Sequence, residues 1–207
     1  MNDKVTEVVF IIDKSGSMHG LEDDTIGGFN SFLDNQRKEN ENCNISTVLF
    51  SSSQKILHSH ENISNIKDLT SKDYIASGTT ALLDALGDSI NNMEEYISDK
   101  KDINVMYIII TDGKENSSRR FNYSSIKNMV SAKKELGWKF IFLASNFDAW
   151  GEGKELGMSK EDCVDYHNDS IGIRKTYSCV SKAVACFCKK DSLDNDWKER
   201  FDEDIKK

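Results

Sequence analysis

The sequence predicts one α/β domain: a doubly wound, mostly parallel, Rossmann-like sheet with helices on both faces and one short antiparallel edge strand. Strand-like and helix-like segments alternate along the chain, as in proteins built from βαβ units. The two most apolar segments, Val5 to Ile12 and Asn104 to Thr111, are continuous, as expected of central strands covered on both faces. The length of 207 residues favours one such domain over two.

The first half of the chain begins with the apolar strand at residues 5–12. Apolar residues at helical spacing then predict a helix over about residues 24–37. Residues 44–52 are rich in apolar and β-branched side chains and predict a second strand. A Ser-rich turn separates this strand from residues 54–60, which predict the antiparallel edge strand. After a polar loop, residues 82–97 show a clear amphipathic helix.

The second half repeats the alternation. Residues 104–111 form the second strongly buried strand, and a helix is predicted over about residues 124–136, where Gly137 provides a stop signal. The apolar residues 138–144 predict the next strand, and residues 148–156 predict a shorter helix.

The predicted domain closes with a short strand over residues 163–166 and an amphipathic helix marked by apolar residues over 173–187. Residues 189–207 are highly charged and have a helical tendency. We therefore predict a domain over residues 1–190, followed by a charged C-terminal tail or helix over residues 191–207.

If the strands of this sheet follow the order 3-2-1-4-5-6, the winding reverses beside the first strand. Ligands of such sheets bind outside the carboxyl ends of the strands at this reversal. Asp13 directly follows the first strand, and Asp112 directly follows the fourth. The sequence therefore predicts that two carboxylates from distant parts of the chain meet in one crevice.

Composition limits the classes of partner and the expected compartment. The formal net charge of −8 argues against nucleic acid or an anionic membrane as the main partner. No apolar segment approaches the length of a membrane span and the first residues lack a signal-peptide pattern, so we expect a cytoplasmic protein. Among the five cysteines, Cys186 and Cys188 form a single C-x-C without a second pair. We expect reduced thiols that mostly pack in the core.

The segment after the first strand carries the most informative pattern. Residues 13–17 read D-x-S-x-S, so a strand end delivers one carboxylate and two hydroxyls to one loop. These groups are hard oxygen donors, which Mg²⁺ prefers in near-octahedral geometry. Asp and Ser at a strand end are also common turn formers and helix caps, which is the alternative interpretation.

Two further segments extend this pattern: residues 77–82 contain Gly-Thr-Thr before a helix, and residues 110–113 read I-T-D-G after a strand. With residues 13–17 they resemble the von Willebrand factor type A (vWA) domain and its metal-ion-dependent adhesion site, over about residues 5–190. The resemblance implies a vWA-like sheet and a bound Mg²⁺, with Mn²⁺ or Ca²⁺ as alternatives. In many members of the family, a carboxylate from a binding partner completes the coordination of the metal.

The same resemblance implies a set of metal ligands in this sequence. They are Asp13, Ser15, Ser17, Thr80 and Asp112. Thr80 fits the family pattern better than the neighbouring Thr79, which is the alternative, because Thr80 is followed directly by the apolar start of the helix. Residues 114–116 are also similar to those of small stand-alone prokaryotic vWA proteins, and the absence of proline hints at a bacterial or phage gene.

Three other patterns are weaker candidates for a site. Residues 151–157 are rich in glycine but lie far from the first strand-to-helix turn, where a dinucleotide-binding loop belongs. His58 and His60 lack a third metal ligand, so an exposed edge strand is the preferred interpretation. Ser64 and Lys67 match a serine–lysine hydrolase pair without its companion motifs.

These observations lead to one preferred function and two alternatives. We expect a protein-binding module rather than an enzyme, in which Mg²⁺ recognises an Asp or Glu of a protein partner, because no general base or nucleophile is placed beside the ligands. The first alternative is a Mg²⁺-dependent enzyme acting on phosphoryl or ester groups. The second is a scaffold in which the metal only joins three loops. The sequence carries no signal for an oligomeric state.

Overall fold

The computed structural model describes residues 4–39, 42–193 and 197–198. Its centre is a six-stranded sheet in the order β3-β2-β1-β4-β5-β6. The strands are β1 (Val5–Asp13), β2 (Cys43–Phe50), β3 (Gln54–Asn62), β4 (Ile103–Thr111), β5 (Lys139–Ala144) and β6 (Cys163–Asp165). Strands β2 and β3 pair antiparallel, and the other neighbouring pairs are parallel. The predicted fold class is confirmed, and the strand order is the one that the sequence-based prediction of a shared crevice takes as its condition.

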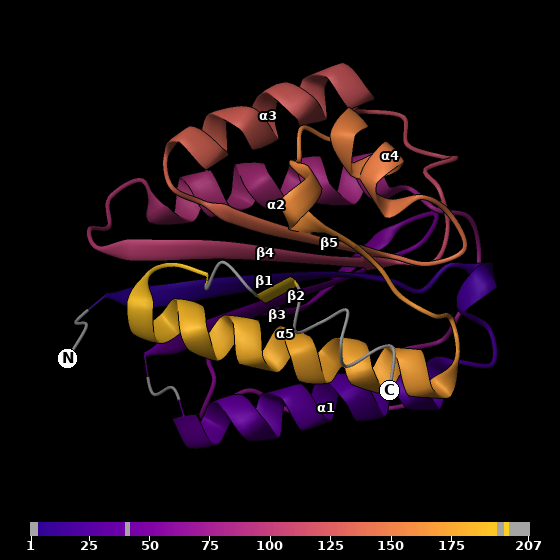
Figure 1. Cartoon of the computed structure of the whole chain (residues 1–207), viewed down its shortest axis with the longest axis horizontal. Coiled ribbons are helices and arrows are strands. Elements are labelled where there is room, and N and C mark those ends of the chain that lie inside the picture. Colours follow the sequence, from indigo (N-terminus) through magenta and orange to yellow (C-terminus); the bar gives the residue numbers. More distant parts are fainter. Residues whose placement is uncertain (1–3, 40–41, 194–196, 199–207) are drawn as a thin grey trace.

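The helices cover both faces of this sheet, as Figure 1 shows. They are α1 (Glu22–Glu39), α2 (Leu82–Ile97), α3 (Tyr123–Glu135), α4 (Ala149–Glu155) and α5 (Ser170–Lys190), with the short 3₁₀ helices η1 (Gly16–Met18) and η2 (Lys160–Asp162). Helices α1 and α5 lie on one face, and α2, α3 and α4 lie on the other (Figure 1). Among the described residues, no helix is both long and apolar enough to span a membrane.

Strand β1 contributes to two separate cores. Val8 and Phe10 belong to the core under α1 and α5, whereas Val9 and Ile11 belong to the core under α2 and α3. Because successive side chains of a strand point to opposite faces, a strand buried on both faces must be apolar at nearly every position. This requirement explains the continuous apolar run of the sequence.

The edge strand β3 departs from its prediction in length and exposure. It has nine residues, and its pairing with β2 shifts register on either side of Thr47. His60 has a positive φ of 53° at this irregular stretch. His58 stacks on Phe29 of α1, whereas His60 stacks on Tyr96 of α2. The interpretation of an edge strand is correct and several of its residues are exposed, but His58 is buried and His60 is half-buried, because they pack on opposite faces of the sheet.

Helices α1 and α5 approach each other closely beside the sheet. A Cβ atom at Gly28 of α1 would lie 2.4 Å from the ring of Tyr177 on α5, so this crossing requires glycine. The predicted tail over residues 191–207 lies mostly outside the described residues. Of its described part, Leu193 and Trp197 pack against the core that α1 and α5 cover.

Candidate metal centre

The candidate site lies at the carboxyl edge of the sheet, where β1 and β4 end side by side. The two strands are parallel and in register up to the pair Ile12 and Ile110. Asp13 is the last residue of β1, and Asp112 directly follows β4. The topology therefore brings the two carboxylates to one place, although they are far apart in the sequence.

Asp13 is fully buried and held by several donors. Its Oδ1 accepts a hydrogen bond from the Ser15 backbone N–H at 2.7 Å, and its Oδ2 accepts one from the Thr111 hydroxyl at 2.6 Å. The phenol of Tyr74 donates to the Asp13 backbone carbonyl at 2.5 Å. Burial raises the pKa of Asp13 to about 6, although these hydrogen bonds act in the opposite direction. Within the described part of the chain, no cationic side chain is paired with this buried carboxylate.

Ser15, Ser17 and Asp112 form a chain of oxygen atoms beside Asp13. The two serine Oγ atoms lie 3.0 Å apart, and the Ser17 hydroxyl donates to Asp112 Oδ1 at 2.5 Å. Ser15 stands at the N-cap position of η1 but makes no capping bond through its side chain. The alternative interpretation of this serine as a helix cap is therefore wrong. Burial raises the pKa of Asp112 as well.

Thr80 joins the same group of oxygens across Gly113. A Cβ atom built on Gly113 would lie 3.1 Å from Thr80 Oγ1, 3.4 Å from Ser17 Oγ and 3.9 Å from Asp13 Oδ2. Oxygens from two loops, residues 13–17 and residues 77–82, therefore lie close to Gly113 of the third loop, where a larger residue would be crowded. The hydroxyl of Thr79 instead donates to Ser52 Oγ at 3.0 Å on the surface. The structure thus brings together the five predicted ligands with Thr80 as the threonine.

Backbone hydrogen bonds hold the first two loops, residues 13–17 and residues 77–82, against each other. The Gly16 N–H donates to the Gly78 carbonyl at 3.0 Å, and the Ser77 N–H donates to the Lys14 carbonyl at 2.8 Å. Gly78 has a positive φ of 80°, and a Cβ there would lie 2.4 Å from Ser52 Oγ. This loop therefore needs a glycine for both its conformation and its close packing.

The Lys-Glu-Asn segment after Asp112 fixes the threonine loop. The Asn116 side chain accepts from the Thr80 N–H at 2.9 Å, while the Asn116 N–H donates to the Thr80 carbonyl at 3.0 Å. Glu115 accepts from the Leu83 N–H at 2.9 Å, so it satisfies a free donor at the start of α2. The residues that follow Asp112 in the sequence therefore hold Thr80 in position.

Sequence reasoning missed Asn168, which lies in the connection from β6 to α5. Its side-chain nitrogen donates to Asp112 Oδ2 at 3.1 Å. Its side-chain oxygen is buried and has no hydrogen-bond partner among the described residues. No local motif marks this asparagine, since it reaches the site only because β6 and α5 fold back onto the sheet edge. Tyr74 was missed as a supporting residue for the same reason, whereas Thr111 lies inside the motif at residues 110–113, which does not indicate its contact with Asp13.

The donor set fits a hard divalent cation. Two carboxylates and three hydroxyls offer the oxygen ligands that Mg²⁺ takes, and the five groups come from loops that are already braced. Among the described residues, no cluster of three or more His, Cys, Asp or Glu side chains is placed to hold a metal. A cation at this edge would therefore depend on hydroxyl ligands. It would supply positive charge and coordination positions for an incoming oxygen.

The family comparison agrees with this geometry. The sequence model of the von Willebrand factor type A domain matches residues 7–176. The chain belongs to the vWA domain family. A comparison with curated proteins finds no match for this chain.

Solved structures with a similar fold are distant in sequence. The minor pilin PilB from Streptococcus sanguinis has a TM-score of 0.61 at 15% identity, covering 88% of this chain and 61% of the pilin. The mussel byssus protein PTMP1, solved with zinc in its metal-ion-dependent adhesion site, has a TM-score of 0.61 at 16% identity, covering 88% and 46%. The ArnB paralog VWA2 from Sulfolobus acidocaldarius has a TM-score of 0.57 at 19% identity, covering 89% and 45%. This vWA domain thus spans less than two thirds of each of these proteins, and the likeness concerns the fold.

Proposed function

We propose that this vWA domain is a metal-dependent protein-binding module of the cytoplasm. In this proposal, Mg²⁺ is held by Asp13, Ser15, Ser17, Thr80 and Asp112 and recognises an Asp or Glu side chain of a protein partner. The observation that carries the proposal is the convergence of carboxylate and hydroxyl oxygens around Gly113. Three of the five donors are neutral, so a divalent cation there keeps a strong attraction for one further carboxylate.

The groups around the five donors support binding rather than catalysis. Thr111, Asn116 and Asn168 contact the donors through a hydroxyl or an amide, which are not general bases near neutral pH. The phenol of Tyr74 donates to the Asp13 carbonyl, and burial raises its pKa well above 10. These neighbours therefore hold the donors in place and have little capacity to move a proton.

The first experiment measures the metal alone. The purified chain is treated with EDTA, and Mg²⁺ or Mn²⁺ is then titrated into it in a calorimeter. We expect the titration to show one binding site. Asp13→Ala should abolish this binding. Asp99→Asn is the matched control, because the Asp99 side chain is 83% exposed on the surface. Equal binding by Asp13→Ala and wild type would contradict the metal site.

The second experiment addresses the partner. The chain is immobilised with Mg²⁺ or with excess EDTA, and captured proteins are compared by quantitative mass spectrometry. A partner should be retained by wild type and Asp99→Asn with Mg²⁺ and lost with EDTA or Asp13→Ala. Replacing single Asp and Glu residues of that partner by Asn and Gln should then abolish binding at one position. Capture that is equal in EDTA would overturn the proposal even where the metal binds.

The enzyme alternative has its own test. Turnover of a generic phosphoester with Mg²⁺, lost in Asp112→Ala, would replace the binding proposal with a catalytic one.

A further inference from the structure

Two thiols from distant parts of the chain meet at the amino edge of the sheet, at the opposite end of the molecule from the candidate metal site. Cys43 is the first residue of β2, and it is paired in register with Thr6 of β1. Cys188 lies near the end of α5 and packs against the same core as Cys43. The fold therefore places the end of α5 directly over the start of β2.

The side chains of Cys43 and Cys188 are in hydrogen-bonding contact, and the Thr6 side chain also hydrogen-bonds to Cys188. Cys43 is fully buried, whereas Cys188 is partly exposed. Two ion pairs hold the end of α5 in this place. Lys4 pairs with Asp191 at 3.0 Å, and Lys189 pairs with Glu39 at 2.9 Å. The two sulfur atoms are thus held together by the surrounding structure.

The contact makes the two thiols unequal. The hydrogen bond from Cys43, together with the contact with Thr6 and the charge of Lys189, lowers the pKa of Cys188. The same contact with Cys188, together with burial, raises the pKa of Cys43. The thiolate is the reactive form of cysteine. A partly exposed thiol with a lowered pKa beside a second, buried thiol is the arrangement found at redox-responsive cysteine pairs.

We infer that Cys43 and Cys188 are a modification site: a dithiol that a peroxide converts reversibly to a disulfide, which ties the end of α5 to β2. The Cys188 thiolate attacks one peroxide oxygen, the O–O bond breaks, and the released hydroxide takes up a proton to become water. Cys188 is then a sulfenic acid. The sulfur of Cys43 attacks the sulfur of Cys188, the S–O bond breaks, and the hydroxide leaves with the Cys43 proton as a second water. Two thiols are oxidised and one peroxide is reduced.

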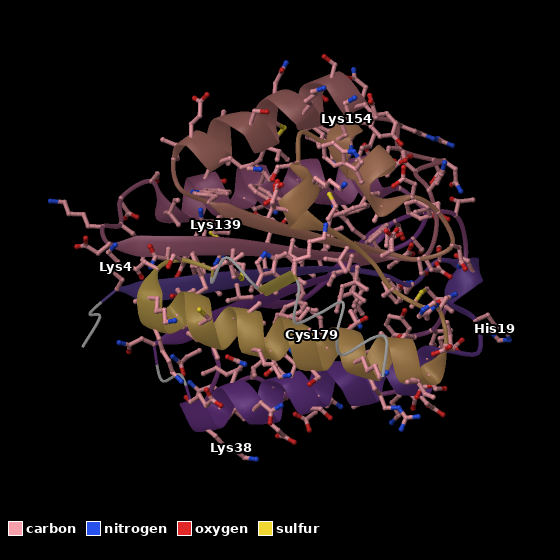
Figure 2. All side chains as sticks on the ribbon, in the orientation of Figure 1. Lys4, His19, Lys38, Lys139, Lys154 and Cys179 are labelled. Atoms are coloured by element: carbon pink, nitrogen blue, oxygen red, sulfur yellow. The ribbon has the colours of Figure 1, made fainter. Side chains whose placement is uncertain are left out.

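The other cysteines are not placed for this chemistry. Cys163 is buried, and burial raises its pKa to about 12, so its thiolate is scarce. Cys179 lies near the middle of α5, away from the helix end that carries Cys188, as Figure 2 shows. Cys186 shares the last turns of α5 with Cys188 and is partly exposed, which makes it the matched control.

The experiment treats the full chain with hydrogen peroxide and measures its intact mass and its peptide map without reduction. The expected product has lost two hydrogen atoms and contains one cross-linked peptide pair joining residues 43 and 188. Thiol reductant should restore the original mass. Cys186→Ser should form the same link, whereas Cys188→Ser should not and should retain a free Cys43. The oxidised wild type should also melt at a higher temperature than the reduced form, because the link constrains the unfolded chain.

Three outcomes would overturn the inference. They are oxidation of Cys188 to sulfinic acid without a link, a link that uses Cys186 or Cys179, and no loss of hydrogen under conditions that oxidise a free peptide thiol. Cys188→Ser replaces a partly exposed side chain, so the test does not depend on the folding of a Cys43 variant. Mg²⁺ affinity is a separate measurement at the other edge of the sheet, so failure here leaves the proposed function untouched.

Discussion

Strand β1 carries two buried carboxylates, Glu7 near its amino end and Asp13 at its carboxyl end, and their surroundings differ. Both are fully buried. Glu7 accepts from the Asn44 amide at 2.7 Å and lies 3.0 Å from the His60 ring nitrogen. In Figure 2, the labelled Lys4 lies near the amino end of this strand and the labelled His19 lies near its carboxyl end, on opposite sides of the molecule. Burying a carboxylate costs free energy, and the neighbours that offset this cost differ between the two ends of the strand.

The difference lies in whether the fold itself supplies a group that can carry positive charge. Glu7 has an imidazole within contact, and that imidazole is in turn stacked on Tyr96. Asp13 has neutral donors from Ser15 and Thr111 and a second carboxylate, Asp112, whose charge acts to raise its pKa. Glu7 therefore has a neighbour within the protein that can carry positive charge, whereas a cation beside Asp13 is what the proposed function adds. We therefore interpret Glu7 as a structural residue and Asp13 as part of the candidate metal site.

The largest expected effect separates these two carboxylates directly. Asp13→Ala should weaken Mg²⁺ binding by at least about 100-fold, since loss even of a residue that only supports a ligand costs about 10–100-fold. Glu7→Gln should leave Mg²⁺ affinity unchanged and destabilise the fold by about 1–3 kcal/mol, because a buried charge-assisted hydrogen bond is weakened. Calorimetry gives the affinities, and urea unfolding gives the stabilities. If Glu7→Gln impaired metal binding as strongly as Asp13→Ala, the two regions would not be distinct.

The pH dependence of metal binding is the second prediction. The folded, metal-free protein holds Asp13 with a pKa of about 6, above its ordinary 3.8. Mg²⁺ requires the ionised form, so its affinity should rise with pH and level off above about pH 6. Below that value the affinity should fall by about tenfold per pH unit, since proton and metal compete for one group.

The same raised pKa predicts the opposite trend without metal. Between pH 3.8 and about 6 the folded form binds more protons at Asp13 than the unfolded form. In EDTA, the contribution of Asp13 to stability should therefore decrease as pH rises through this window. Asp13→Asn should remove that contribution, so wild type and variant should diverge as pH rises. Parallel melting curves for the two proteins across the window would contradict the assignment.

The contrast between predicted and missed residues has a physical basis. The positions of Asp13 and Asp112 follow from the sequence, because two buried strands end there and parallel strands of this order end side by side. The sequence also marks the hydroxyls through local spacing. Their convergence is now seen in the structure, while their role as metal ligands stays a prediction.

Residues that act across the fold could not be found in this way. Asn168 contacts Asp112 through the return of β6 and α5, and Cys43 meets Cys188 through the packing of the end of α5. The partnership of Glu7 with His60 depends on an irregular stretch of β3 that reverses the face of the histidine. Each of these contacts depends on tertiary packing, which leaves no periodic signal along the chain.

The fourth prediction distinguishes the two adjacent threonines. Thr80→Ala should weaken Mg²⁺ binding by about tenfold, because it removes one hard oxygen from the group around Gly113. Thr79→Ala is the matched control and should bind normally, since the Thr79 hydroxyl contacts Ser52 instead. Thr80→Ser should restore most of the affinity by returning the hydroxyl. Weaker binding by Thr79→Ala than by Thr80→Ala would reverse the assignment of the threonine.

The smallest expected effect concerns Asn168, which tests whether the site extends beyond its five donors. Asn168→Ala should weaken Mg²⁺ binding by roughly three- to tenfold, because Asp112 loses the amide that holds its Oδ2. Asn146→Gly is the matched control, since Asn146 contacts only the backbone carbonyl of Asp112, at 3.4 Å, and glycine tolerates its positive φ of 65°.

Asn168→Asp sharpens this test because it adds charge without changing the size of the side chain. Beside Asp112 the new carboxylate should lower the melting temperature in EDTA at neutral pH through like-charge repulsion. Mg²⁺ should then raise the melting temperature of Asn168→Asp by more than that of wild type, because the cation relieves the repulsion as well as binding its ligands. If Mg²⁺ raised the melting temperature of both proteins equally, residue 168 would not interact electrostatically with the metal. Its contact with Asp112 would then serve only to pack the loops.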